Sequence, residues 1–155
     1  MIDARFGHVN VIARDWRRLA DFYTRVFGME IVPPLRDYRA EDVEAGTRVA
    51  GIAFRGAHLR LPGLGDNGPT LEIYQYDSGP EGIPSVANRP GFRHIAFAVP
   101  DVQAAREAIL EAGGGEVGAI VSSTTADGRR VTWTYTTDPE GNIIELQAWS
   151  EPVKG

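Results

Sequence analysis

The hydrophobic positions of the chain follow two patterns, one typical of strands and one typical of helices. Segments rich in valine, isoleucine and phenylalanine run over residues 8–13 and 94–99, as expected for strands. After each segment, apolar residues recur three and four positions apart, the period of a helix that buries one face. They are Leu19, Phe22, Tyr23 and Val26 in the first half, and Val102, Ala105, Ile109 and Ala112 in the second. We therefore predict a strand followed by a helix at both places.

Residues suited to helix ends flank both predicted helices. Asp15 and Asp101 stand directly before them, where a short carboxylate accepts the free amide hydrogens of a first turn and faces the positive end of the helix dipole. Gly28 and the glycines at 113–115 follow the helices and tolerate the left-handed conformation that ends a helix. The chain is then expected to turn back towards strands.

Further strands are predicted by β-branched and aromatic residues between turn signals. We expect them at 31–32, 49–55, 58–61 and 70–76 in the first half, and at 117–122, 130–136 and 142–149 in the second. The stretches 63–69 and 138–142 contain the glycine, proline, asparagine and aspartate typical of loops. The polar stretch 33–46 is predicted to be irregular.

The two halves of the chain repeat one pattern. The motif Phe-Gly-His-Val at 6–9 is answered 86 positions later by Phe-Arg-His-Ile at 92–95, and the same offset relates the two capping aspartates. We predict a single domain made of two repeats, 1–77 and 91–150, joined by a linker rich in glycine and proline at 78–90. The first repeat carries a net insertion of 13 residues before its last strand, and 33–46 is expected to absorb much of it.

Composition excludes several classes of function. A formal charge of -5 without a dense basic run argues against binding to nucleic acid, because that affinity requires many phosphates to be neutralised. No apolar run approaches the ~20 residues that span a bilayer, and no signal-peptide pattern opens the sequence, so we expect a cytoplasmic protein without a membrane segment. Cysteine is absent, so a tightly bound metal must use histidine, carboxylate and water.

Four residues stand out as candidate ligands. Glu72 and Glu145 are flanked by bulky apolar residues, and His8 and His94 open hydrophobic strands. A carboxylate is costly to bury unless a charge, a metal or hydrogen bonds compensate it. Each repeat supplies one residue of each type, which favours a single pseudo-symmetric site for a divalent ion, with zinc, nickel, cobalt, manganese and iron all suitable. The alternative is that the histidines are ordinary core residues and the glutamates pair with Arg93 or another arginine.

These features resemble the vicinal oxygen chelate superfamily, which includes glyoxalase I, methylmalonyl-CoA epimerase, extradiol dioxygenases and bleomycin or fosfomycin resistance proteins. The resemblance rests on the two copies of a β-α-β-β-β pattern, the Phe-x-His strand starts, the Asp-Pro-Glu-Gly-Asn turn at 138–142 and Ile-Glu-Leu at 144–146. It implies an α+β fold of two βαβββ modules in an open half-barrel sheet around a metal cleft, often in a homodimer. The implied metal ligands are His8, Glu72, His94 and Glu145.

The resemblance further implies a lyase or isomerase that acts on a small oxygenated substrate. In that chemistry an ion binds the substrate oxygens while a carboxylate moves a proton at the adjacent carbon. Glu145 is our first candidate for this base, and Glu72 is the second.

Two other functions stay open. An extradiol-type dioxygenase would use iron with two histidines and one carboxylate. Glu72 argues against it by filling a position that such chemistry leaves free, and we interpret His58 as a surface or strand-edge residue. A drug-binding protein of the bleomycin-resistance type needs no metal. Such a protein does not need histidine and glutamate at all four positions, whereas this chain has them there, which argues against this function.

Aromatic residues near the glutamates are candidates for a substrate pocket. Trp133 and Tyr135 alternate on one predicted strand, and Tyr74 shares the parity of Glu72. The alternative is that they are core or dimer-interface residues. We assign Trp16 and Trp149 to packing, and Arg129-Arg130 to a solvated hairpin tip rather than to an anion site.

Overall fold

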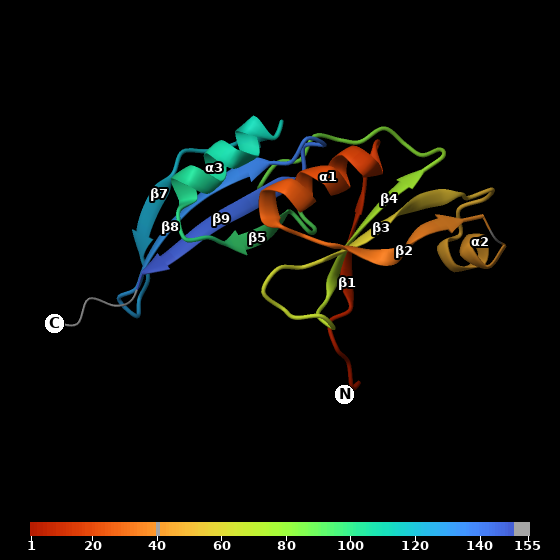
Figure 1. The fold of residues 1–155 in the computed structure, drawn as a ribbon, viewed down its shortest axis with the longest axis horizontal. Coiled ribbons are helices and arrows are strands. Elements are labelled where there is room, and N and C mark those ends of the chain that lie inside the picture. Colours follow the sequence, from red (N-terminus) through yellow and green to blue (C-terminus); the bar gives the residue numbers. More distant parts are fainter. Residues whose placement is uncertain (40, 151–155) are drawn as a thin grey trace. The chain divides into compact units, whose positions relative to one another are not determined.

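The computed structural model describes residues 1–39 and 41–150, and the chain divides into two compact units, Met1–Gly82 and Ile83–Gly155. We call these units the first and second modules. The division falls inside the predicted linker at 78–90. In each module a first strand is followed by a helix and then by further strands, and the strands form one mixed sheet on which the helix packs (Figure 1). The predicted α+β fold with two βαβββ modules is confirmed.

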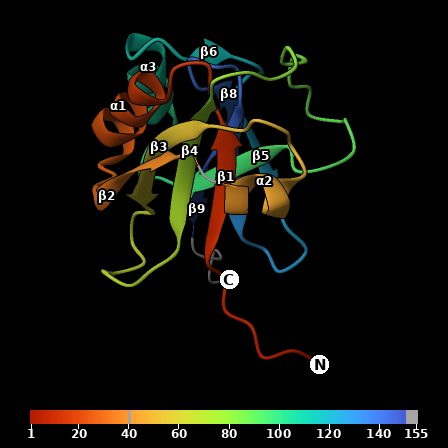
Figure 2. The same ribbon diagram turned by 90° about the vertical axis from the view of Figure 1, so that its right-hand side faces the viewer.

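The first module follows the predicted order with one extra helix. Its elements are β1 (His8–Ile12), α1 (Trp16–Phe27), β2 (Ile31–Tyr38), α2 (Glu41–Thr47), β3 (Phe54–Arg60) and β4 (Thr70–Tyr76). The sheet has the order β1-β4-β3-β2, in which β1 runs parallel to β4 and the other pairs are antiparallel. Figure 2 shows β1 beside β4 in this sheet.

The second module repeats this arrangement. Its elements are β5 (His94–Ala98), α3 (Val102–Glu111), β6 (Gly115–Glu116), β7 (Val121–Thr124), β8 (Arg130–Thr137) and β9 (Ile143–Ser150). The sheet has the order β5-β9-β8-β6, and β7 also pairs with β8. The first strand again runs parallel to the last, because β5 pairs with β9. Both halves of the sequence repeat therefore build the same strand pairing.

The helices begin and end where the sequence predicts. The Asp15 carboxylate accepts hydrogen bonds from the amides of Arg17 and Arg18, both at 3.1 Å, and Gly28 ends α1 in the left-handed conformation with φ of 65°. Asp101 accepts from the Ala104 amide at 3.1 Å. These bonds satisfy amide hydrogens that a first helical turn leaves without partners.

Each helix buries its predicted apolar stripe against its own sheet. In α1 the buried residues are Trp16, Leu19, Ala20, Phe22 and Tyr23, and the helix packs on β3 and β4. In α3 the buried residues are Val102 and Ile109, and the helix packs on β8 and β9. Of the helices in residues 1–39 and 41–150, none has the length and apolarity needed to cross a membrane.

Several segments differ from the sequence predictions. Parts of the predicted strands at 49–55 and 58–61 form one strand, β3, which begins at Phe54 and continues through Gly56, and residues 49–53 are not in a strand. Of the predicted strand at 117–122, residues 117–120 are likewise not in a strand. A Cβ atom at Gly56 would lie 1.9 Å from the Ile73 carbonyl oxygen, so this glycine permits a close strand approach rather than a turn. The stretch 33–46 is not irregular, since it contains most of β2 and of α2. The two prolines of β2 fall where its pairing with β3 shifts register between Val32 and Arg36.

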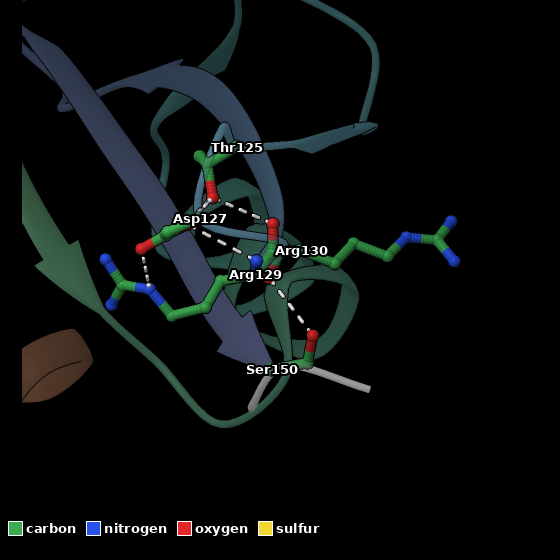
Figure 3. A network of polar contacts seen from close by, with 5 residues as sticks. All are labelled: Thr125, Asp127, Arg129, Arg130 and Ser150. Atoms are coloured by element: carbon green, nitrogen blue, oxygen red, sulfur yellow. Dashed lines mark hydrogen bonds and ion pairs between the residues drawn. The ribbon is translucent and has the colours of Figure 1, made fainter. Parts of the chain in front are cut away.

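The hairpin between β7 and β8 confirms the prediction for Arg129-Arg130 (Figure 3). Arg129 Nε donates to Asp127 Oδ2 at 2.7 Å, and Thr125 also donates to Asp127. These bonds, first that from Thr125 and then that from Arg129, lower the pKa of Asp127 to about 2. Trp149 is wrongly predicted to be a packing residue, because it is 45% exposed with the Arg129 guanidinium 4.8 Å from its ring centroid. Strand β9 is already near its end at this residue.

The cap of α1 gives a stability prediction. Replacing Asp15 with alanine leaves two amides of the first turn without acceptors, so the free energy of unfolding should fall by about 1 kcal/mol. Asp21→Ala is the matched control, because the exposed Asp21 side chain pairs with Arg25 one turn along the same helix, an interaction worth less than about 0.5 kcal/mol. Urea unfolding followed by circular dichroism measures both, and equal losses would contradict the capping role.

Candidate functional site

The first module places His8 beside Glu72 through the parallel pairing of β1 and β4. Asn10, two positions after His8, is the strand partner of Glu72, so the side chains of His8 and Glu72 lie on one face of the sheet. His8 Nε2 and Glu72 Oε2 are 3.4 Å apart. Parallel pairing thus brings together two residues that are 64 positions apart in the sequence.

The second module repeats this geometry with His94 and Glu145. Ala96, two positions after His94, is the strand partner of Glu145. His94 Nε2 and Glu145 Oε2 are 3.0 Å apart. Each module therefore presents one imidazole nitrogen and one carboxylate oxygen in the same register, as the sequence repeat predicts.

Glu72 is the more buried of the two carboxylates. Its side chain is 10% exposed, whereas that of Glu145 is 20% exposed. Within the described part of the chain neither glutamate pairs with an arginine, and both face histidines. The alternative in which Arg93 or another arginine neutralises them is therefore wrong for this structure.

His58 belongs to the site, and its interpretation as a surface or strand-edge residue is wrong. It lies on β3, an inner strand of the sheet, directly opposite Glu72 on β4. Its Nε2 atom is 3.0 Å from Glu72 Oε1 and 2.7 Å from the Tyr74 hydroxyl. Burial lowers the pKa of His58, and the charges of Arg36 and His8 act in the same direction, while Glu72 opposes them. The periodicity of the sequence does not predict that His58 contacts Glu72, because this contact depends on the register of β3 with β4.

Tyr74 completes a buried polar cluster with His58 and Glu72. Its ring packs on Phe54 at a centroid distance of 4.8 Å, and its hydroxyl lies 2.7 Å from His58 Nε2. Burial and, after it, the nearby charge of Glu72 raise the pKa of Tyr74 above its ordinary value. The phenol therefore stays protonated and can donate to the carboxylate. The prediction that Tyr74 contacts substrate stays a prediction.

Tyr135 and Trp133 lie next to the histidine of the second module. The Tyr135 ring is 5.2 Å from the His94 ring and 5.3 Å from the Trp133 ring, measured between centroids. Tyr135 is also the strand partner of Glu145. Burial, followed by the charge of Glu145, raises the pKa of Tyr135. The two aromatic rings therefore adjoin the His94–Glu145 pair, where we predicted substrate contacts.

The chemistry of the two pairs fits a divalent ion. Metal–ligand bonds of about 2.1 Å that meet at about 90–110° separate two ligand atoms by about 3.0–3.4 Å, and the two nitrogen–oxygen distances are 3.4 Å and 3.0 Å. Imidazole and carboxylate are ligands that first-row ions accept. In residues 1–39 and 41–150, no group of three or more such side chains is arranged around one point. A four-ligand centre would combine one pair from each module, and it stays a prediction.

The lowered pKa of His58 gives a prediction for stability against pH. The unfolded chain binds the His58 proton near the ordinary value of 6.5, whereas the folded protein binds it less tightly. The folded state should therefore be fully stable above pH 6.5 and lose stability as the pH falls below it. His58→Gln should flatten the stability curve between about pH 7.5 and about pH 5. Urea unfolding of both proteins with a chelator present tests this, and parallel curves would argue against it.

Known proteins share this fold and, in one case, recognisable sequence. An ethylmalonyl-CoA/methylmalonyl-CoA epimerase from Cereibacter sphaeroides is 26% identical over 144 residues, which cover 92% of this chain and 96% of the relative. A glyoxalase family protein from Bacillus cereus matches with a TM-score of 0.79 at 17% identity, over 97% of each chain. A glyoxalase I mutant from Zea mays matches with a TM-score of 0.54 at 19% identity, over 92% of this chain and 46% of that one. The two structural matches show the shared fold.

A family model gives the broader assignment. The model of the glyoxalase/bleomycin resistance protein/dioxygenase superfamily matches residues 5–146, which include both His–Glu pairs. The chain belongs to the glyoxalase/bleomycin resistance protein/dioxygenase superfamily.

Proposed function

We propose that this protein is a divalent-metal-dependent isomerase or lyase, with epimerase-like proton transfer as its reaction. The observation that carries the proposal is the His–Glu pair that recurs in the same register in each module. His8, Glu72, His94 and Glu145 would hold the ion. The epimerase relative, which matches over nearly the whole chain, supports this branch of the superfamily.

The protein side chains would divide the proton transfer between them. When bound, the ion supplies a positive charge that stabilises negative charge on a substrate oxygen. Glu145 would take the proton from the adjacent carbon, because it is the more exposed of the two carboxylates. Glu72 is more enclosed and has further hydrogen bonds, so we assign it to binding first and to proton transfer second.

The substrate would be a small carbonyl compound with an acidic carbon–hydrogen bond. Ethylmalonyl-CoA and methylmalonyl-CoA, the compounds in the name of the relative, are the first to test. Trp133 and Tyr135 would line the apolar side of the bound substrate, because their rings lie beside His94. On the family resemblance we also propose a homodimer and a cytoplasmic location.

An oxygenase is the second candidate, since His58 gives the first module two histidines and one carboxylate. That set is the ligand set of many non-haem iron oxygenases. However, the Tyr74 hydroxyl lies 2.7 Å from His58 Nε2, so an iron ion would have to displace this hydrogen bond to bind that nitrogen. Oxygen uptake with iron and a catechol would favour this candidate over the isomerase.

Metal binding is the first experimental test. Protein treated with chelator, reloaded with zinc or cobalt and desalted should retain about one ion per chain, because imidazole and carboxylate ligands hold such ions tightly. A His8→Ala, His94→Ala double variant should lose this ion and is the control for non-specific binding. Retention below about a tenth of an ion by the unaltered protein would favour a metal-free binding protein instead.

Hydrogen exchange is the second test, because it reports proton transfer directly. With methylmalonyl-CoA in deuterium oxide, the metal-loaded protein should exchange the hydrogen on the carbon between the carbonyl groups. Glu145→Gln should slow this exchange by about 10²–10⁴-fold, the usual contribution of a general base. Exchange that persists at the full rate in Glu145→Gln, with the metal still bound, would reject Glu145 as the base.

A further inference from the structure

The two glutamates have different neighbours at equivalent positions of the repeat. His58 on β3 is the strand partner of Glu72, and Tyr135 on β8 is the strand partner of Glu145. The residue two positions after Glu72 is Tyr74, whereas the residue two positions after Glu145 is Gln147. The repeat therefore keeps both carboxylates but changes what surrounds them.

In the first module His58 binds the carboxylate, and Tyr74 in turn binds His58. His58 Nε2 lies 3.0 Å from Glu72 Oε1, and the Tyr74 hydroxyl lies 2.7 Å from His58 Nε2. Glu72 Oε2 then faces His8. One oxygen of the carboxylate is thus fixed by the fold, and the other points towards the candidate metal ligand.

Gly56 makes this arrangement possible. A Cβ atom at Gly56 would lie 2.6 Å from Cδ1 of the Tyr74 ring, which is closer than such contacts allow. The ring occupies the space above the glycine and so reaches His58 with its hydroxyl. The contact of Tyr74 with Phe54, which lies two positions before Gly56 on β3, holds the ring in this place.

In the second module the equivalent residues, Tyr135 and Gln147, contact other side chains than Glu145. The Tyr135 ring packs against His94, and Gln147 Oε1 accepts a hydrogen bond from Trp149 Nε1 at 2.7 Å. Within residues 41–150, Glu145 pairs with His94 at 3.0 Å, as Glu72 pairs with His8, while Tyr135 and Gln147 have the other contacts just named. In the described residues, no counterpart of the His58 contact restrains Glu145.

We infer that His58 and Tyr74 are positioning residues that fix Glu72 as a permanent metal ligand, while the changed neighbours of Glu145 leave that carboxylate free to move. This inference rests on the proposed metal-dependent function. Side chains that hydrogen-bond to a metal ligand orient it, and their loss commonly weakens metal binding by about 10–100-fold. The same restraint would hinder a carboxylate that must turn towards a substrate carbon and accept its proton.

Matched tyrosine variants test the inference. Tyr74→Phe removes the hydroxyl that bonds to His58, the partner of Glu72, but keeps the ring on Phe54. Tyr135→Phe makes the same change at the residue opposite Glu145. Cobalt titration, followed by the visible absorption of the ion, should show about 10–100-fold weaker binding for Tyr74→Phe and unchanged binding for Tyr135→Phe. A changed cobalt spectrum in Tyr74→Phe would further support an altered ligand geometry.

Histidine variants supply a second measurement. His58→Gln keeps an N–H donor near Glu72, whereas His58→Leu does not, so His58→Gln should bind cobalt more tightly than His58→Leu. Urea unfolding of the metal-free variants separates positioning from packing. Lower stability without weaker cobalt binding would overturn the inference.

The outcomes also separate this inference from the proposed function. If the unaltered protein binds cobalt and Tyr74→Phe binds it as tightly as Tyr135→Phe does, the inference is wrong and the metal-dependent function stands. If the unaltered protein binds no cobalt, both are wrong.

Discussion

The parallel pairing of the first and last strands in each module is the constraint on which the candidate site depends. It sets Glu72 beside His8 and Glu145 beside His94 with the same two-residue stagger. A shift of one residue in this register would turn each glutamate to the opposite face of its sheet. The helix that follows the first strand of each module packs on that sheet and thereby helps to hold the register.

Much of this structure could be predicted from the sequence because the signals are local or repeated. The caps at Asp15 and Asp101, the helix stripes and the strand that contains Glu72 all follow from spacing along the chain. The two histidines and two glutamates could be named as candidate ligands because the repeat supplies each type twice. The sequence predicts one centre for all four and does not predict the contact of one histidine with one glutamate inside each module, and that centre stays a prediction.

What the sequence did not reveal depends on contacts between strands. The sequence predicts a surface or strand-edge position for His58, whereas the residue faces Glu72 across the pairing of β3 and β4. No local sequence pattern reports the register of two strands. The predicted strands at 49–55 and 58–61 leave out Gly56, whose place inside β3 depends on the close approach of β4. The stretch 33–46 is predicted to be irregular, yet its two prolines lie within β2 where the register with β3 shifts.

The distance along the chain between β1 and β4 has a consequence for synthesis on the ribosome. The N-terminal strand emerges first, but its partner is the last strand of the module, so β1 has no sheet to join until β4 has left the exit tunnel. During that interval its hydrophobic side chains are exposed to other nascent chains and to chaperones. The second module imposes the same delay on β5, so each half of the protein acquires its histidine–glutamate pair only when its own translation is complete.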